Sequence, residues 1–372
     1  MCVSLLIASE FLPVSLLTPI ASELHATDGQ AGLAISISGL FAVATSLFAI
    51  GWLGKVNRRY VMLAMTVLML ISICLIADAK SFPLLLAARA VLGITIGGFW
   101  SLSTATVMRL VPSQHVSKAL GIVYTGNAMA TAFAAPLGSY FGGLIGWRGV
   151  FWALTPFIAF NLAWQFLSLP SMPAEGDGTG PSPLKLLRHR YVAVAMLAAM
   201  LSFSGMFSVF TYFRPFLERQ VHVDVTTLSV LLLVLGLAGF IGTTVASRYA
   251  QKHLTFSLCF APLVLAIVTM ATYFSSFSVW LVGIAFLLWG TLNSGIPILW
   301  SNWLTVGGKK FPESAGGLFV GCVQLSIMLG AASGGKLLDN YSIFATFVGG
   351  TILLIASALI VGHGQRILPS HR

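Results

Sequence analysis

The sequence predicts an all-α membrane protein with twelve transmembrane helices arranged in two six-helix halves. Of its 372 residues, 57% are apolar and 8% are charged, whereas soluble domains carry about 25% charged residues. In lipid the backbone must pair its own polar groups, which permits only helices or closed barrels. Barrel strands alternate apolar and polar residues over segments of about ten. The apolar segments here are longer and uninterrupted, so they predict helices.

Twelve apolar segments approach the length of about 20 residues that a helix needs to cross the hydrocarbon core. They cover residues 2–22, 31–53, 59–78, 82–107, 117–141, 148–169, 191–213, 226–248, 253–274, 277–304, 314–337 and 342–363. The longest polar segment contains several Gly and Pro residues, which favour a flexible linker. We therefore expect an N-terminal six-helix half at 1–169, a cytoplasmic linker at 170–190 and a C-terminal six-helix half at 191–372.

The two halves share a short internal repeat. The Trp-Ser pair at 100–101 recurs at 300–301, and Pro112 recurs as Pro312, both offset by 200 residues. Transporters built from two parallel repeats bind their solute between the halves, near the middle of the membrane. A chance match of so few positions is the alternative interpretation.

Basic residues predict the orientation of the chain. Fourteen of the twenty Lys and Arg residues fall in the even-numbered connections and the C-terminal segment. Cytoplasmic loops carry such an excess, so both termini are expected to face the cytoplasm. The net charge of +10 follows from these loops and does not indicate a nucleic-acid partner.

Glu10 lies near the middle of the first apolar segment. An ionised carboxylate there costs about 3 kcal/mol, and ionisable residues inside membranes are usually functional. We therefore expect Glu10 to carry a proton or to contact a ligand. The alternative is a hydrogen-bonded carboxyl that only joins two helices. The chain begins almost inside this helix, and we expect a few residues of the helix to be absent from this start.

Arg89 lies inside the fourth apolar segment. A guanidinium in lipid needs a partner or an aqueous cavity, and it stays protonated. Glu10 is a candidate partner, because the two residues differ in depth by about 8 Å at about 1.5 Å per helical residue. That difference is within the reach of an Arg side chain. A purely structural ion pair is the alternative to a role in proton coupling.

The connection 51–59 contains Gly51 and the adjacent pair Arg58 and Arg59. A glycine turn followed by paired arginines suits a short cytoplasmic loop that holds two helix ends together during gating. The alternative is a basic anchor at the membrane surface.

The fifth apolar segment carries a second candidate gating motif, formed by Gly126, Pro136 and Gly138. Small residues let helices approach closely, and proline bends a helix. Packing alone would also explain these residues.

Polar and aromatic side chains inside other segments are candidates for contact with a solute, because they can stack on a ring and bond its edges. The candidates are Trp100, Asn127, Tyr212, Asn293, Trp300 and Gln324. Interfacial anchoring of Trp and bonds from Asn or Gln to a neighbouring helix are the alternatives.

Motifs for enzyme chemistry are not found in the sequence. There is no phosphate-binding loop, no nucleophile–base pair and no cluster of metal ligands, and the four cysteines have no metal-ligand spacing. We therefore expect no cofactor, no metal and no enzymatic activity, with all cysteines reduced.

Three motifs carry a family resemblance over the whole chain. The connection 51–59, Arg89 with Gly93, and the segment from Gly126 to Gly138 resemble the signatures of proton-coupled efflux antiporters of the drug:proton type, with twelve spans, in the major facilitator superfamily. Two positions depart from that pattern. Asn57 replaces the usual acid before the Arg pair, which puts a charge relay across the loop in doubt, and Ala135 replaces a glycine.

A narrower pattern resembles the bacterial purine ribonucleoside efflux pumps of that superfamily. It consists of the segments Glu10–Pro19, 97–101, 108–112, 134–138 and 146–148. The resemblance implies efflux of purine ribonucleosides or related small polar solutes in exchange for protons, by a monomer in the bacterial inner membrane. Its partners would be the solute, protons and the lipid bilayer, with Glu10 and Arg89 as the coupling residues. Sugar or multidrug efflux is one alternative, and a non-transporting sensor or assembly protein is another.

Overall fold

The computed structural model describes residues 1–53, 56–112, 115–173, 183–307 and 312–363. In these ranges every regular element is a helix. The N-terminal part contains α1 (Cys2–Ser15), α2 (Leu17–Glu23), α3 (Asp28–Leu53), α4 (Arg58–Ala77), α5 (Phe82–Leu110) and α6 (Val116–Ser168). The C-terminal part contains η2 (Pro183–Arg188), α7 (Arg190–Phe210), α8 (Phe213–Phe216), η3 (Leu217–Val221), α9 (Val225–Phe274), α10 (Val279–Gly307), α11 (Pro312–Asn340) and α12 (Ile343–His363).

All twelve predicted spans lie on these helices. Ten helices of the described residues are long and apolar enough to cross a membrane, and the bent pair of α1 and α2 makes eleven. The twelfth arises because α6 contains two spans, which meet at Gly146 with φ 74°. Glycine adopts this left-handed conformation without a steric penalty, so the chain can turn back there. The two spans within α9 meet at His253, whose backbone is also non-helical but not left-handed, with φ −137° and ψ 45°.

The first predicted span, 2–22, is not one straight helix. The axes of α1 and α2 differ by 66°, and the break lies at Leu16, three residues before Pro19. Proline removes a backbone donor and clashes with the carbonyl four residues earlier, which is that of Ser15, so the helix bends at this place. In the C-terminal half the matching helix, α7, is long enough to span the membrane by itself, and the short α8 follows it.

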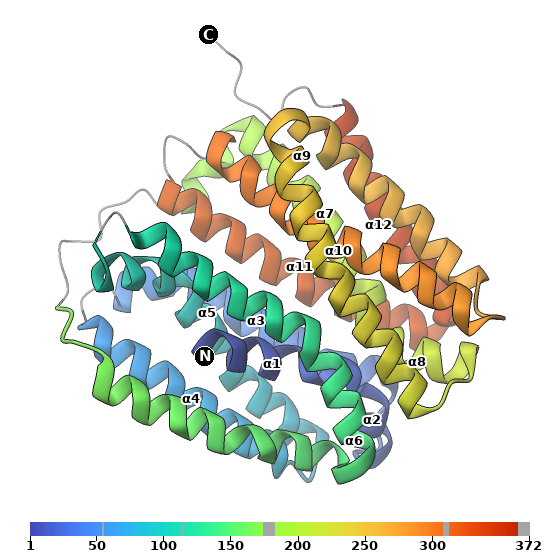
Figure 1. Ribbon diagram of the computed structural model, residues 1–372, viewed down its shortest axis with the longest axis horizontal. Coiled ribbons are helices and arrows are strands. Elements are labelled where there is room, and N and C mark those ends of the chain that lie inside the picture. Colours follow the sequence, from blue (N-terminus) through green and yellow to red (C-terminus); the bar gives the residue numbers. More distant parts are fainter. Residues whose placement is uncertain (54–55, 113–114, 174–182, 308–311, 364–372) are drawn as a thin grey trace.

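The helices form two bundles that lie side by side (Figure 1). The N-terminal bundle, blue to green, and the C-terminal bundle, yellow-green to red, meet where α3 packs on α11 and α6 packs on α9. Small residues permit the closest approaches, because a Cβ on Gly39 would lie 3.0 Å from the carbonyl oxygen of Gln324. The linker predicted at 170–190 lies partly outside the described residues, as does the C-terminus, so these boundaries stay a prediction.

Candidate functional site

Glu10 lies on α1, at the boundary between the two bundles, and only 4% of it is exposed. Its carboxylate Oε1 accepts a long hydrogen bond of 3.4 Å from Nε2 of Gln324 on α11. A glutamine amide has both a donor and an acceptor, so it can pair with a carboxylate or with a protonated carboxyl group. Two residues proposed for different roles, proton coupling and solute contact, are therefore in direct contact.

Arg89, on α5, is fully buried and lies next to Glu10 as the depth argument predicted. Its guanidinium binds the backbone of α1, however, with Nη1 donating to Ser9 O at 2.8 Å and Nη2 to Glu10 O at 3.1 Å. Two further bonds reach α3, from Nε to Ala34 O at 2.9 Å and from Nη2 to Ser38 Oγ at 3.1 Å. Among the described residues the carboxylate of Glu10 forms no ion pair with this guanidinium.

The proline in α1 explains why a cation binds the main chain there. In a regular helix the carbonyl of Ser9 would accept a hydrogen bond from the residue four positions later, which is Pro13. Proline has no N–H, and a carbonyl without a partner inside a membrane costs several kcal/mol. Arg89 supplies the missing donor, so this side chain stabilises the broken helix that carries Glu10.

The glycine motif of α6 packs against the same helix. Ser4 Oγ on α1 donates to the carbonyl of Gly126 at 3.1 Å, and a Cβ on Gly138 would lie 2.6 Å from Ser15 Oγ. Pro136 lies inside α6, close to this contact. The motif therefore lets α6 approach the helix that bears Glu10.

Three of the predicted solute contacts are half-buried. Trp100 on α5 stacks on Tyr124 of α6, with ring centroids 6.2 Å apart and an interplanar angle of 28°. Asn127 lies one helical turn from Tyr124 on α6, and Asn293 lies on α10. These side chains keep surface that a solute could contact.

The other two aromatic candidates are fully buried. Trp300 packs edge-on against Trp303, and its Nε1 has no hydrogen-bond partner among the described residues. Tyr212 donates its hydroxyl to the carbonyl of Ala331 at 2.7 Å, and its ring lies against Gly334 of α11. Tyr212 is therefore separate from the pair of Glu10 and Gln324, and it holds α7 and α8 against α11.

The other predicted gating motif is the connection 51–59, and the structure describes only part of it. Gly51 lies near the end of α3, residues 54–55 lie outside the described residues, and Arg58 and Arg59 begin α4. Asn57, which replaces the usual acid, accepts from the N–H of Arg59 at 3.1 Å and donates from Nδ2 to Ser171 Oγ at 2.8 Å. The amide thus caps α4 and also binds the segment that follows α6, and a carboxylate has no donor for the second bond.

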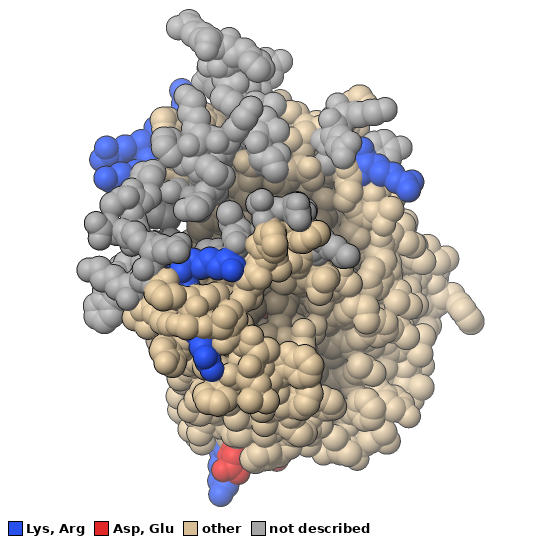
Figure 2. Space-filling view, turned by 60° about the vertical axis from the view of Figure 1, so that its left-hand side comes forward, with Lys and Arg blue, Asp and Glu red and all other residues tan. Residues whose placement is uncertain are grey.

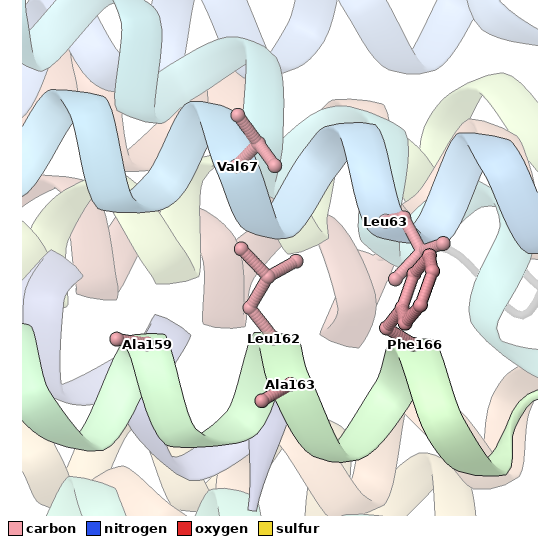
Figure 3. Close-up of a pocket in the computed structure, with 6 residues that line it drawn as sticks. All are labelled: Leu63, Val67, Ala159, Leu162, Ala163 and Phe166. Carbon is pink, nitrogen blue, oxygen red and sulfur yellow. The ribbon is translucent and has the colours of Figure 1, made fainter.

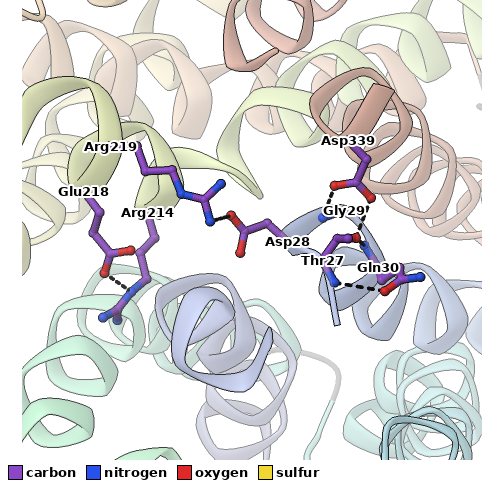
Figure 4. Close-up of polar contacts among 8 residues, drawn as sticks. All are labelled: Thr27, Asp28, Gly29, Gln30, Arg214, Glu218, Arg219 and Asp339. Atoms are coloured by element: carbon purple, nitrogen blue, oxygen red, sulfur yellow. Dashed lines mark hydrogen bonds and ion pairs between the residues drawn. The ribbon is translucent and has the colours of Figure 1, made fainter. Parts of the chain in front are cut away.

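A polar cluster near the start of α3, at the end opposite the connection to α4, joins the two bundles (Figure 4). This cluster was not predicted. Asp339 of α11 accepts from Thr27 Oγ1 at 2.6 Å and from the N–H of Gly29 at 3.1 Å. It therefore caps the N-terminus of α3 from the other bundle. Arg219 of η3 forms an ion pair with Asp28 at 2.5 Å.

Arg214 strengthens the same junction. Its Nε donates to Glu218 at 2.7 Å, and its Nη1 donates to the carbonyl of Ser15 at the end of α1. The sequence signal for this cluster was the presence of charged residues at the ends of spans on the side with few basic residues. Their pairing across 200 or 300 positions, as between Thr27 and Asp339, had no local signature.

One face of the molecule is hollowed and basic (Figure 2). A recess opens in the middle of this face, and the charged side chains described around it are Lys or Arg, with acidic ones only at the lower edge. In the described part of the chain no group of three or more His, Cys, Asp or Glu side chains could hold a metal ion.

Known proteins are similar to this chain over nearly its whole length. The sequence model of the Major Facilitator Superfamily matches residues 1–334. The transcription regulatory protein OpdE of Pseudomonas aeruginosa is 44% identical over 366 residues, covering 96% of this chain and 90% of OpdE. The purine ribonucleoside efflux pump NepI of Salmonella typhimurium is 37% identical, covering 99% of this chain and 93% of NepI.

A solved structure has a similar fold. The crystal structure of a bacterial homolog of the human lysosomal transporter Spinster, inward-facing and unoccupied, gives a TM-score of 0.75 at 14% identity. It covers 97% of this chain and 92% of that one.

Proposed function

This chain belongs to the Major Facilitator Superfamily, and we propose that it exports purine ribonucleosides or related small polar solutes in exchange for protons. The hydrogen bond between Glu10 and Gln324 carries the proposal, because it places an ionisable group at the contact between the two bundles. The name of the efflux pump that is 37% identical supports the solute class.

Glu10 would couple the proton to movement of the two bundles. A carboxylate accepts the amide N–H of Gln324, whereas a protonated carboxyl can donate to the amide oxygen instead. Binding and loss of the proton therefore change a contact between α1 and α11. Rocking of one bundle against the other would then expose the site to each side of the membrane in turn.

Arg89 would act as a positioning residue for Glu10. Its hydrogen bonds hold the backbone on both sides of the carboxylate and fix α1 to α3. The guanidinium keeps its charge, so it can hold this geometry whether or not Glu10 carries a proton.

The proposed solute contacts differ in accessibility. Trp100, Asn127 and Asn293 are half-buried, so a solute could contact them with little rearrangement. Trp300 and Tyr212 are fully buried, and each would contact a solute only after the bundles move. Stacking on Trp100 and hydrogen bonds from the asparagines suit the ring and the edge of a nucleobase.

We further propose that the protein works as a monomer in the bacterial inner membrane with both termini in the cytoplasm. The positive-inside rule supports this orientation, because most Lys and Arg residues belong to one set of connections. The hollowed face of Figure 2, on which most of the described charged side chains are basic, would then be the cytoplasmic face.

Transport by inverted membrane vesicles tests the coupling residue. Glu10→Gln keeps the size and hydrogen-bonding capacity of the side chain but cannot bind or release a proton. We expect uptake of radiolabelled inosine driven by a pH gradient to be abolished, while exchange of inosine without a gradient continues. The matched control is Glu23→Gln, at an exposed acid near the end of α2. Full gradient-driven uptake by Glu10→Gln would rule out Glu10 as the coupling site.

Two alternative functions, efflux of another solute and a sensor that transports nothing, can be tested by the choice of solute and by measuring flux. Growth in the presence of 6-mercaptopurine, toxic sugar analogues or cationic dyes distinguishes purine efflux from sugar or multidrug efflux. The relative named as a transcription regulatory protein favours a second candidate, a membrane-bound sensor. Vesicles that show no solute-dependent flux with a panel of nucleosides, sugars and dyes would favour that candidate.

A further inference from the structure

An apolar groove runs along the outside of the N-terminal bundle, between α4 and the last turns of α6 (Figure 3). It has a volume of about 410 Å³ and is lined by Leu63, Val67, Ala159, Leu162, Ala163 and Phe166. Leu63 and Phe166 meet at one end, while Val67 and Leu162 face each other across the gap. The two alanines are too small to fill the space between the helices, so the groove stays open.

A cation lies at the Phe166 end of this groove. Arg59, Leu63 and Val67 are spaced by four residues, so they lie on one face of α4. The Arg59 guanidinium is 5.6 Å from the centre of the Phe166 ring, and its Nη2 donates to the carbonyl of Phe166 at 2.8 Å. These contacts hold the positive charge beside Phe166, which lines one end of the groove.

The charge of Arg59 is not neutralised by the described residues. Arg59 forms no ion pair with an acidic side chain among them, and its Nε has no hydrogen-bond partner there. Arg109 adds a second cation nearby, because its Nη1 binds Pro173 O while the N–H of Arg58 binds the adjacent Met172 O. The segment 172–173 thus brings the start of α4 and the end of α5 together at a basic rim.

A ligand for this site must be long and apolar at one end and anionic at the other. Within a bilayer, burying apolar surface gives no hydrophobic driving force, because lipid tails are as apolar as leucine. Selection therefore depends on the fit of a chain between the helices and on attraction of a phosphate to the guanidinium. Basic sites between transmembrane helices recognise anionic lipid headgroups in this way.

We propose that this groove is a binding site for one anionic phospholipid, with an acyl chain between α4 and α6 and the phosphate at Arg59. The distance from Arg59 to Val67 along α4 is about 12 Å, so the groove holds the upper part of one chain. The site lies on the outer surface of the N-terminal bundle and does not include Glu10 or Gln324.

Native mass spectrometry of the purified full chain tests this site. The protein is titrated with phosphatidylglycerol and, separately, with phosphatidylcholine. We expect one phosphatidylglycerol to be retained, with affinity at least about fivefold above that for phosphatidylcholine, the value expected from one basic residue. Inorganic phosphate should not displace it, because a free anion does not occupy the groove. Displacement by phosphate, or equal retention of both lipids, would overturn the proposal.

Two variants and two controls separate charge from shape. Arg59→Gln removes the cation, with Arg188→Gln in η2 as its control. Ala163→Leu fills the groove with apolar atoms, with Ala153→Leu, at another exposed alanine of α6, as its control. We expect both test variants to lose the retained phosphatidylglycerol and both controls to keep it. Each variant must keep the unfolding midpoint of the parent, which shows that it is folded.

The combination of results decides the proposal. Loss in Arg59→Gln but not in Ala163→Leu would reduce the site to general attraction between a basic surface and anionic lipid, and would overturn the groove. Loss in Ala163→Leu but not in Arg59→Gln would make the groove a contact for any acyl chain, and would overturn the assignment to an anionic lipid.

Discussion

The fourth membrane span of each bundle, α5 in one and α10 in the other, carries a chemically different residue at the matching position. At an offset of 200 residues, Arg89 on α5 corresponds to Trp289 on α10. Arg89 binds the main chain of α1, whereas Trp289 packs in an aromatic cluster, with its ring 4.8 Å from Phe213 and 6.0 Å from Phe210. The N-terminal bundle is therefore organised around a buried cation and the C-terminal bundle around buried rings.

The difference has a local cause in the first helix of each bundle. Pro13 lies within α1, while α7 contains no proline. In a helix without proline every interior carbonyl can accept a hydrogen bond from within the helix. The helix that packs on α7 therefore does not have to supply a donor such as arginine. The buried guanidinium of Arg89 therefore has a structural role in the N-terminal bundle, and any role in proton coupling would be additional to it.

The repeated Trp-Ser pair shows the same asymmetry. Trp100 is half-buried and stacks on Tyr124, whereas Trp300 is fully buried beside Trp303. Identical residues in a sequence repeat can therefore differ in burial and in their contacts. If the solute binds between the bundles as proposed, its aromatic contact on the N-terminal side is accessible and the matching one is packed away.

The largest expected effect is on stability of the N-terminal bundle. Arg89→Met keeps an unbranched side chain but removes its hydrogen-bond donors, which leaves the Ser9 carbonyl without a partner. We expect the free energy of unfolding in mixed micelles to fall by about 3 kcal/mol. In a Pro13→Ala background, residue 13 can donate to Ser9, so the same substitution should cost about 1–2 kcal/mol less. Equal costs in the two backgrounds would show that Arg89 does not compensate for the proline.

A loss of stability of intermediate size is expected where a glycine lets two helices pack closely, and it should differ between the two bundles. A Cβ on Gly205 of α7 would lie 2.7 Å from the backbone oxygen of Gly350, which cannot move aside. We expect Gly205→Ala to lower the free energy of unfolding by about 1–3 kcal/mol. Gly138→Ala should cost less, because the atoms beside it are the ends of the Leu12 and Ser15 side chains. A larger cost at Gly138 would reverse this ranking.

The smallest effect should come from the aromatic cluster. Trp289 Nε1 donates to Thr269 Oγ1 at 3.1 Å, and Trp289→Phe removes that bond while keeping an aromatic ring. We expect a loss of about 1 kcal/mol in the free energy of unfolding. Thr269→Val, which also removes the bond from Thr269 Oγ1 to Leu265 O, should give a similar loss, and the double variant should add little, since both substitutions remove the bond between Trp289 and Thr269. Additive losses would show that the rings, and not the bond, determine the effect.

The proximity of Glu10 and Arg89 could be predicted from the sequence, because depth in a membrane follows from counting residues along two helices. The atoms that meet could not be predicted in this way. Whether Arg89 reaches a carboxylate or a carbonyl depends on the rotation of α1 and α5 about their axes, which the sequence does not give. The contact of Glu10 with Gln324 depends further on how the two bundles dock.

Hydropathy and charge along the chain were enough to predict the class of fold, the number of spans and the positions of the buried charges. These properties follow from local free energies, because each apolar segment and each charge has its own cost in lipid. The packing of the helices was needed to find the cap that Asp339 provides for α3, the role of Arg89 as a donor to a broken helix and the groove beside Arg59. These features join residues that are far apart in the chain, and their energies exist only once the helices have packed.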